Sequence, residues 1–224
     1  LDSIVKSAIE KYGSEATQTS VQVASVKIVL QDGSGAIRGL TVGNPRGFSA
    51  PSAFSLGEIA TQIDLKSLSE EVPVIEHITI RAPEVFFELN EKGQNNLDGL
   101  KKNLQSGTAS SSSSAAKQDG PEPKLIIRKL VFADGNIHAR VVPLDKDYEL
   151  KLPNIQMNDL GGKTGATPSQ IASQAVSILT ERALAEIKRK GIDQYKAQLE
   201  GEVNKRLDSE KGKIGDKLKG VLGY

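Results

Sequence analysis

The stretch VPVIEHITIRAPEVFFEL, residues 72–89, decides the fold because its apolar side chains keep a two-residue period. One phase holds before Pro83 (Val74, Ile78, Ile80), and the other holds after it (Val85, Phe87, Leu89). A two-residue period predicts half-buried strands. A proline where the phase changes predicts a bulge or a sheet edge. Residues 72–89 therefore predict two consecutive strands that share one apolar face.

The same period recurs on both sides of this stretch, with turn residues between the runs. Asp32–Gly33 and Asp134–Gly135 are typical turn dipeptides. The other predicted strands cover residues 21–30 (with a bulge near Ala24), 35–42, 58–65, 124–133, 136–142 and 148–157. About eight strands joined by short loops favour an antiparallel meander.

Helical periods occur at both ends of the chain. Residues 1–13 predict a helix that ends at Gly13, and Thr167 with Pro168 predicts the start of another helix. The expected organisation is an N-terminal helix (1–13), a first half of the sheet body with a short helix (14–105), a serine-rich linker (106–123), a second half of the same sheet (124–162) and amphipathic C-terminal helices (163–224).

The charge balance argues against nucleic-acid binding. The 224 residues include 29 lysines and arginines and 28 aspartates and glutamates, for a net charge of +1. No overall field therefore attracts a polyanion. Cysteine is absent from the sequence, which excludes disulfides and thiolate-bound metals. We expect no cofactor, no metal and no nucleic-acid partner.

Candidate catalytic motifs fail on spacing. GGKTG, residues 161–165, resembles the end of a phosphate-binding loop, but Met157 stands where that loop requires its upstream glycine. Carboxylates within and beside the strands are scattered, which predicts a solvated face rather than an acid–base pair. They are Asp64, Glu76, Glu84 and Glu88. We therefore predict that the chain is not an enzyme.

The apolar face of the predicted strands is the main candidate for a binding surface. Such a face must be covered by helices, by another sheet or by a ligand. If acyl chains cover it, the groove residues are Val26, Ile28, Leu40, Ile63, Ile78, Ile80, Val85, Phe87, Leu130, Phe132 and Ile137. The alternative is that the helices cover the face entirely.

Two further segments are candidates for functional surfaces. The loop in VGNPRGFSAPSAFSLGEI, residues 42–59, has the composition of a strand connector at the rim of the sheet. Its candidate residues are Asn44, Pro45, Gly47, Phe48 and Phe54. The C-terminal segment carries a narrow apolar stripe on a charged helix: Ile192, Tyr195, Leu199, Val203 and Leu207. That stripe is expected to pack on the sheet, a membrane surface or a partner protein.

Several segments, taken in order, resemble the AsmA-like family of bacterial envelope proteins. They are GNPRGF (43–48), IDLKSL (63–68), VIEHITIRAPEV (74–85), GQNNLDGL (93–100), LPNIQMNDLGG (152–162) and GATPSQIASQAVSILTERAL (165–184). The resemblance implies a curved sheet whose concave face carries lipid acyl chains, in a periplasmic body held by an N-terminal inner-membrane anchor. The expected fold class is α+β, with a curved, groove-like, mostly antiparallel sheet, an N-terminal helix and a long amphipathic C-terminal helical region.

The function implied by the resemblance is non-enzymatic and concerns envelope and lipid homeostasis, with a phospholipid or other acyl lipid as partner. Because the chain begins at Leu1, we expect an anchor to precede it; the alternative is that the chain begins inside a soluble protein. The alternative function is a structural or adaptor module that binds an envelope protein or a membrane through the C-terminal helix. Self-stacking would need an exposed edge strand, such as one that carries Pro73 and Pro83.

Overall fold

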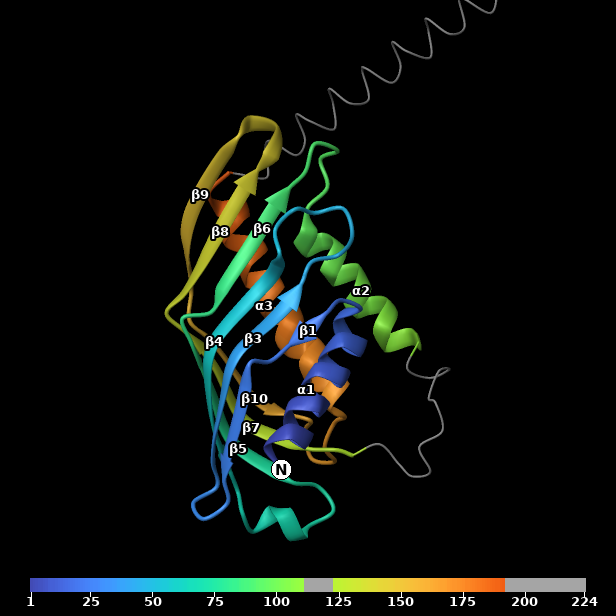
Figure 1. Cartoon of the computed structure of the whole chain (residues 1–224), viewed down its shortest axis with the longest axis vertical. Coiled ribbons are helices and arrows are strands. Elements are labelled where there is room, and N and C mark those ends of the chain that lie inside the picture. Colours follow the sequence, from blue (N-terminus) through green and yellow to red (C-terminus); the bar gives the residue numbers. More distant parts are fainter. Residues whose placement is uncertain (111–122, 192–224) are drawn as a thin grey trace, which may run out of the picture.

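A computed structural model describes residues 1–110 and 123–191 (Figure 1). For residues 106–110 it describes the backbone only. The helices are α1 (Asp2–Thr17), α2 (Asn96–Ser110) and α3 (Pro168–Arg189), with 3-10 turns η1 (Ser67–Ser69) and η2 (Val142–Leu144). The strands are β1 (Val21–Gln22), β2 (Ser25–Val29), β3 (Ser34–Gly43), β4 (Ser52–Ile63), β5 (Val74–Arg81), β6 (Glu84–Leu89), β7 (Ile126–Ala133), β8 (Gly135–Val141), β9 (Lys146–Leu152) and β10 (Ile155–Leu160). They form one open, mostly antiparallel sheet, which confirms the α+β class.

Consecutive short strands in this sheet continue one another as long, bent strands. β5 and β6 both pair with β4, while β7 and β8 run alongside them and β10 and β9 lie beyond. Ala82 (φ 47°) and Asp134 (φ 58°) interrupt neighbouring strands in left-handed conformations, and the Ala82 amide donates to Ala133 O at 2.8 Å. No extra residue accompanies this break, because Arg81 and Glu84 pair with Glu58 and Ser55 at equal spacing along both strands. The feature at Pro83 is therefore a bend between two strands and not the predicted bulge, and the sheet curves around the helices (Figure 1).

The Asp134–Gly135 turn does not reverse the chain. β7 is parallel to β5 and β8 is parallel to β6, because the connection from β6 to β7 includes α2. A Cβ on Gly135 would lie 2.8 Å from Leu152 Cδ2 and 3.0 Å from Pro83 Cγ. The glycine therefore allows close approach of neighbouring strands. Ten strands replace the expected eight because the predicted 21–30 and 148–157 strands are each divided in two.

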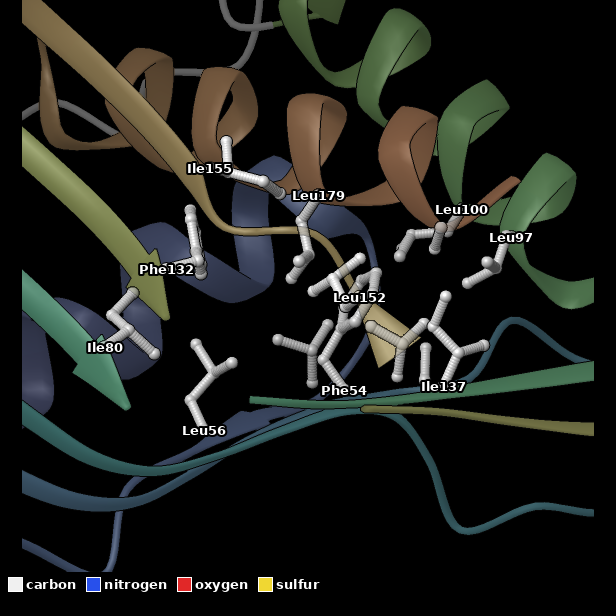
Figure 2. Close-up of a cluster of buried hydrophobic side chains, with 14 of the residues drawn as sticks. Phe54, Leu56, Ile80, Leu97, Leu100, Phe132, Ile137, Leu152, Ile155 and Leu179 are labelled. Atoms are coloured by element: carbon white, nitrogen blue, oxygen red, sulfur yellow. The ribbon is translucent and has the colours of Figure 1, made fainter. Parts of the chain in front are cut away.

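A row of apolar side chains crosses the whole sheet on its concave face. Its members are Val26, Ile37, Ile59, Ile80, Phe132 and Ile155, each paired with the next across adjacent strands. Figure 2 shows Phe54 and Ile137 on the same face, with Leu179 of α3 and Leu97 and Leu100 of α2 pointing toward the sheet. All these residues except the half-buried Ile37 are buried. The three helices thus supply the cover that an apolar sheet face requires.

Helix α1 does not end at Gly13, as its sequence predicts, but continues to Thr17 and ends at left-handed Gln18. A Cβ on Gly13 would lie 3.0 Å from Val21 Cγ1, so this glycine lets the helix approach β1. Side chains of α1 then cap the sheet edge: Asp2 accepts from Ile28 N, Glu10 from Val23 N and Ser14 from Val21 N. This edge is closed to further pairing.

The prolines that suggested an edge lie inside the sheet. Pro73 directly precedes β5 and Pro83 lies between β5 and β6, both of which have neighbours on two sides. The two edges of the sheet are instead the β1–β2 side and the β9–β10 side. The edge proposed for self-stacking is therefore wrong, because both prolines directly precede inner strands, where no ladder hydrogen bond is required of them.

Helix boundaries near the linker and near α3 follow local chemistry. α2 extends to Ser110, five residues into the predicted linker, and the remainder of that linker lies outside the described residues. The predicted start at Thr167 is confirmed by a capping box, in which Thr167 Oγ1 accepts from Gln170 N and Gln170 Oε1 accepts from Thr167 N. α3 ends at Arg189, just before left-handed Gly191 (φ 76°).

Thr167→Ala is expected to lower the free energy of unfolding by about 1 kcal/mol, because it removes the hydroxyl that caps the first turn of α3. Urea unfolding followed by circular dichroism measures the change. Thr164→Ala, which alters an exposed threonine in the preceding loop, serves as the matched control and should change stability by less than about 0.5 kcal/mol. Equal effects of the two variants would contradict the capping role.

Candidate functional site

Most of the predicted groove residues lie in the packed core. Buried members of the set are Val26, Ile80, Val85, Phe87, Leu130, Phe132 and Ile137. Helices α2 and α3 fill the concave side of the sheet above them (Figure 2). At these residues the helices, and not a lipid, cover the apolar face, as the alternative interpretation of the sequence expected. An apolar sheet face is stabilised by packing against an apolar helix surface.

The remaining groove candidates, Ile28, Leu40, Ile63 and Ile78, are half-buried. Ile28 and Ile78 lie on one cross-strand row through Gly35 and Thr61, next to the end of the sheet where β2 turns into β3. Ile63 lies farther toward that end and is the last residue of β4. The apolar face therefore becomes accessible toward one end of the sheet, whereas Leu40 lies farther along β3.

Exposed large apolar side chains gather at the same end. The described residues include six such side chains, and five of them form what we call the apolar tip: Leu1, Ile4, Leu30, Leu65 and Leu68. Figure 1 shows the N-terminus, the β2–β3 turn and η1 together at this end. The sixth, Leu144, lies in the β8–β9 connection at the other end of the sheet.

Hydrogen bonds hold the three segments of the apolar tip together. Asp2 Oδ1 accepts from Ile28 N at 3.0 Å, which fixes the start of α1 beside the end of β2. Gln62 Nε2 donates to Asp32 O at 2.6 Å, and Ile63 N donates to Gly33 O at 2.8 Å. A Cβ on Gly33, which has a φ of 73°, would meet Ile63 O at 2.5 Å, so only glycine allows the turn to lie against the end of β4.

Two carboxylates beside the tip, those of Asp32 and Asp64, accept hydrogen bonds within local turns. Asp32 accepts from the hydroxyl and the amide of Ser34, and these hydrogen bonds lower the pKa of Asp32 below its usual value. Asp64 accepts from the Lys66 amide at 2.9 Å. The exposed side chain of Lys66 stands between Leu65 and Leu68 in sequence. The tip therefore combines projecting leucines with charges that stay hydrated at its surface.

Sequence reasoning did not identify the tip as a site. Leu30 ends the run that contains β2, and Leu65 was assigned to a strand face, yet both are exposed. Their signal was local: leucines stand next to turn residues at Asp32–Gly33 and in the polar run LKSLSEE, residues 65–71. Apolar residues inside otherwise polar turns have no neighbours in sequence with which to form a core.

The rim loop lies at the opposite end of the sheet, between β3 and β4 (Figure 1). Asn44 Nδ2 donates to Ala50 O at 2.6 Å, which closes the loop on itself. Pro45 and the half-buried Phe48 contact α2, since a Cβ on Gly99 would lie 3.3 Å from Pro45 Cγ and 3.9 Å from Phe48 Cε2. Gly47 has a φ of 98°. Phe54 lies in β4, fully buried in the core rather than in the loop.

A buried polar network joins the rim loop to α2 and β6. Asn96 Nδ2 donates to Asn44 Oδ1 at 2.7 Å and to Phe86 O at 2.6 Å, and its Oδ1 accepts from Glu88 N at 2.9 Å. The Glu88 carboxylate accepts from the amide and hydroxyl of Ser49 and from the Ala50 amide. Glu88 is 3% exposed, so the prediction of a solvated carboxylate was wrong there.

The network connects two segments that carried the family resemblance, GNPRGF and GQNNLDGL, which are about fifty residues apart in the sequence. Because each polar atom of Asn96 has a partner, burial of this side chain is compatible with stability. The network fixes the shape of the rim loop, since the Ser49 hydroxyl and the Ser49 and Ala50 amides all donate to the Glu88 carboxylate.

Other candidate chemistry is not assembled in the described residues. Residues 1–110 and 123–191 contain no group of three His, Asp or Glu side chains that could hold a metal ion. Within the same ranges, no helix is both long and apolar enough to cross a membrane. The predicted partner helix, with Ile192, Tyr195, Leu199, Val203 and Leu207, lies outside the described residues.

Comparisons with known proteins give no relative from which a function can be transferred. No family model, no curated protein and no solved structure matches the chain.

Proposed function

We propose that this chain is the body of a non-enzymatic envelope protein of the AsmA-like kind, held at the periplasmic side of the inner membrane, and that it takes part in lipid homeostasis by contacting lipid through its apolar tip. The observation that carries the proposal is the tip itself. Five of the six exposed large apolar side chains of the described residues are gathered there, on three separate segments.

The accessible part of the predicted groove supports the same proposal. Ile28, Ile63 and Ile78 are half-buried on the concave face next to the tip, and the core begins directly behind them with Ile80 and Phe132. An acyl chain that left a bilayer at the tip would meet this apolar strip before it met the helices. The contact with lipid is therefore proposed for the end of the sheet and not for its whole length.

A fluid bilayer suits the tip better than a rigid partner does. The leucines project from a helix start, a hairpin turn and a 3-10 loop, and this arrangement can insert into an interface that adapts to each side chain. The nearby charges include more acidic than basic groups, among them Glu70 and Glu71. We therefore expect binding to depend on apolar burial and to persist at high salt, since screening weakens only the electrostatic part.

Leu65→Ser combined with Leu68→Ser is expected to weaken binding to vesicles of phosphatidylethanolamine and phosphatidylglycerol by roughly 30-fold. The two side chains are 37% and 48% exposed, and losing their insertion should remove about 1 kcal/mol each, or about 2 kcal/mol together. Co-sedimentation at low and high salt measures the binding. Their exposure predicts that the variant folds normally.

Leu144→Ser is the matched control, because Leu144 is 38% exposed at the other end of the sheet. Binding that is lost in both variants, or that disappears when salt is raised, would contradict insertion of the tip. Native mass spectrometry of the purified protein tests the acyl-chain contact separately: we expect a bound lipid that Ile63→Gln reduces. Purification without any bound lipid would contradict that part of the proposal.

A further inference from the structure

A polar hollow lies beside the rim loop, at the opposite end of the sheet from the apolar tip. Its volume is about 790 Å³, and its walls come from residues 18–19 just after α1, residues 44–48 of the rim loop and residues 93–103 before and within α2. Pockets of this size accommodate small ligands. The apolar tip and the predicted groove do not extend into the hollow, so its chemistry is independent of lipid contact.

The buried network described above supports one wall of the hollow. Asn96 joins the rim loop to α2 through Asn44, and Glu88 holds the loop at Ser49 and Ala50. These side chains fix the positions of the lining residues Asn44, Arg46 and Phe48 without facing the ligand themselves. A wall fixed in this way loses little conformational entropy when a ligand binds.

Side-chain amides dominate the lining. Gln18, Asn44, Gln94, Asn95 and Asn103 contribute five amides from three segments of the chain, and Thr19 adds a hydroxyl. Each amide presents a donor and an acceptor side by side. Within the part of the chain that the structure describes, the amide groups of the exposed Gln18 and Gln94 side chains have no hydrogen-bond partner. These two are therefore available to a ligand.

Three charged side chains line the hollow, two cationic and one anionic. Arg46 and Lys102 line it together with Asp98, whose carboxylate accepts from Asn95 Nδ2 at 2.7 Å. The first turn of α2 is already capped, because Asn95 Oδ1 accepts from Asp98 N at 2.7 Å. The Asp98 amide at this helix start thus has an internal partner where a bound phosphate would require a free one.

We infer that the hollow binds a saccharide. Sugar hydroxyls both donate and accept hydrogen bonds, as do the paired atoms of the lining amides. The half-buried Phe48 adds an aromatic surface, whose negative π face suits the C–H groups of a sugar ring. A single ring and polar walls give little apolar surface for a lipid tail, and the five amides, which outnumber the three charged side chains, match a ligand rich in hydroxyl groups.

Nuclear magnetic resonance titration of the full ¹⁵N-labelled chain tests this inference. The probes are chitotriose, maltotriose and inorganic phosphate, each added separately at millimolar concentration. We expect at least one of the two trisaccharides to shift the amide signals of residues 44–48 and 93–99. Shifts in this region with phosphate alone would overturn the saccharide assignment, and so would the absence of shifts there with both sugars.

Gln94→Leu tests the role of the exposed amide. Because this side chain has no hydrogen-bond partner among residues 1–110 and 123–191, the variant should keep its stability. It should bind the responsive trisaccharide about tenfold more weakly, the loss expected when a ligand hydroxyl loses its hydrogen bond. Gln22→Leu changes an exposed glutamine of β1 that does not line the hollow and should bind as the unmodified chain does. Unchanged binding by Gln94→Leu would overturn the inference.

Discussion

Asn96→Ala is expected to lower the free energy of unfolding by about 3 kcal/mol, as measured by urea unfolding. The Asn96 side chain is 0% exposed and serves three partners: Asn44 Oδ1, Phe86 O and Glu88 N. Alanine leaves these groups in the interior without the hydrogen bonds that compensate for their loss of water, at a cost of about 1–3 kcal/mol for each group that stays unsatisfied. The rim loop should also lose its fixed position relative to α2.

Asn103→Ala is the matched control on the same helix. Asn103 is half-buried, and its Nδ2 donates to Thr17 O at 3.1 Å, so the loss should be about 1 kcal/mol. Asn96→Asp separates shape from hydrogen bonding, because it keeps the size of the side chain but removes the Nδ2 donor. If Asn96→Ala and Asn103→Ala were equally destabilising, the network would not be the element that fixes the rim loop.

Local periodicity predicted the strands because one face of the sheet is buried and the other is solvated. The row from Val26 to Ile155 illustrates this alternation, since β2, β3, β4, β5, β7 and β10 each contribute one apolar residue to it. Thr167 was predicted as a helix start for a similar reason: a cap acts through atoms within four residues. Features that depend on near neighbours in the sequence were therefore accessible without the structure.

Strand pairing over long distances could not be predicted in the same way. Asp134–Gly135 has the composition of a hairpin turn, and only the pairing of β7 with β5 and of β8 with β6 shows that the chain continues in one direction. Gly13 looked like a helix end, but it serves the contact with Val21. In both cases glycine is required because a side chain outside its own turn or helix packs against it: Leu152 for Gly135 and Val21 for Gly13. Local propensity does not include such contacts.

The sequence indicated separate parts of the candidate site but not the contacts between them. The rim loop and GQNNLDGL were recognised separately, and the sequence did not indicate that Asn44 and Asn96 bind each other. Glu88 was predicted to be solvated, but its carboxylate is buried because the Ser49 and Ala50 amides donate hydrogen bonds to it. Those residues belong to a different loop, so the sequence around Glu88 does not reveal them. The apolar tip was missed because its leucines come together only after the turns have folded.

Phe54→Ala is expected to be the most destabilising single substitution considered, with a loss of about 3–5 kcal/mol in the free energy of unfolding. Phe54 is 0% exposed and pairs with Val42 on one side and Val85 on the other. Removing the ring takes its apolar surface out of the core and leaves a cavity beneath α2 and α3 that rigid strands cannot close. Urea unfolding and the melting temperature both report this loss.

Phe48→Ala supplies the contrast, because the two phenylalanines belong to the same stretch of sequence but occupy different environments. Phe48 is half-buried against α2 in the rim loop, so its loss should cost about 1–2 kcal/mol, in proportion to the smaller area it removes from water. If Phe48 also forms the aromatic surface of the polar hollow, this variant should reduce the shifts caused by a trisaccharide while the core stays intact. Equal destabilisation by the two variants would mean that the rim loop is part of the core and not a wall built upon it.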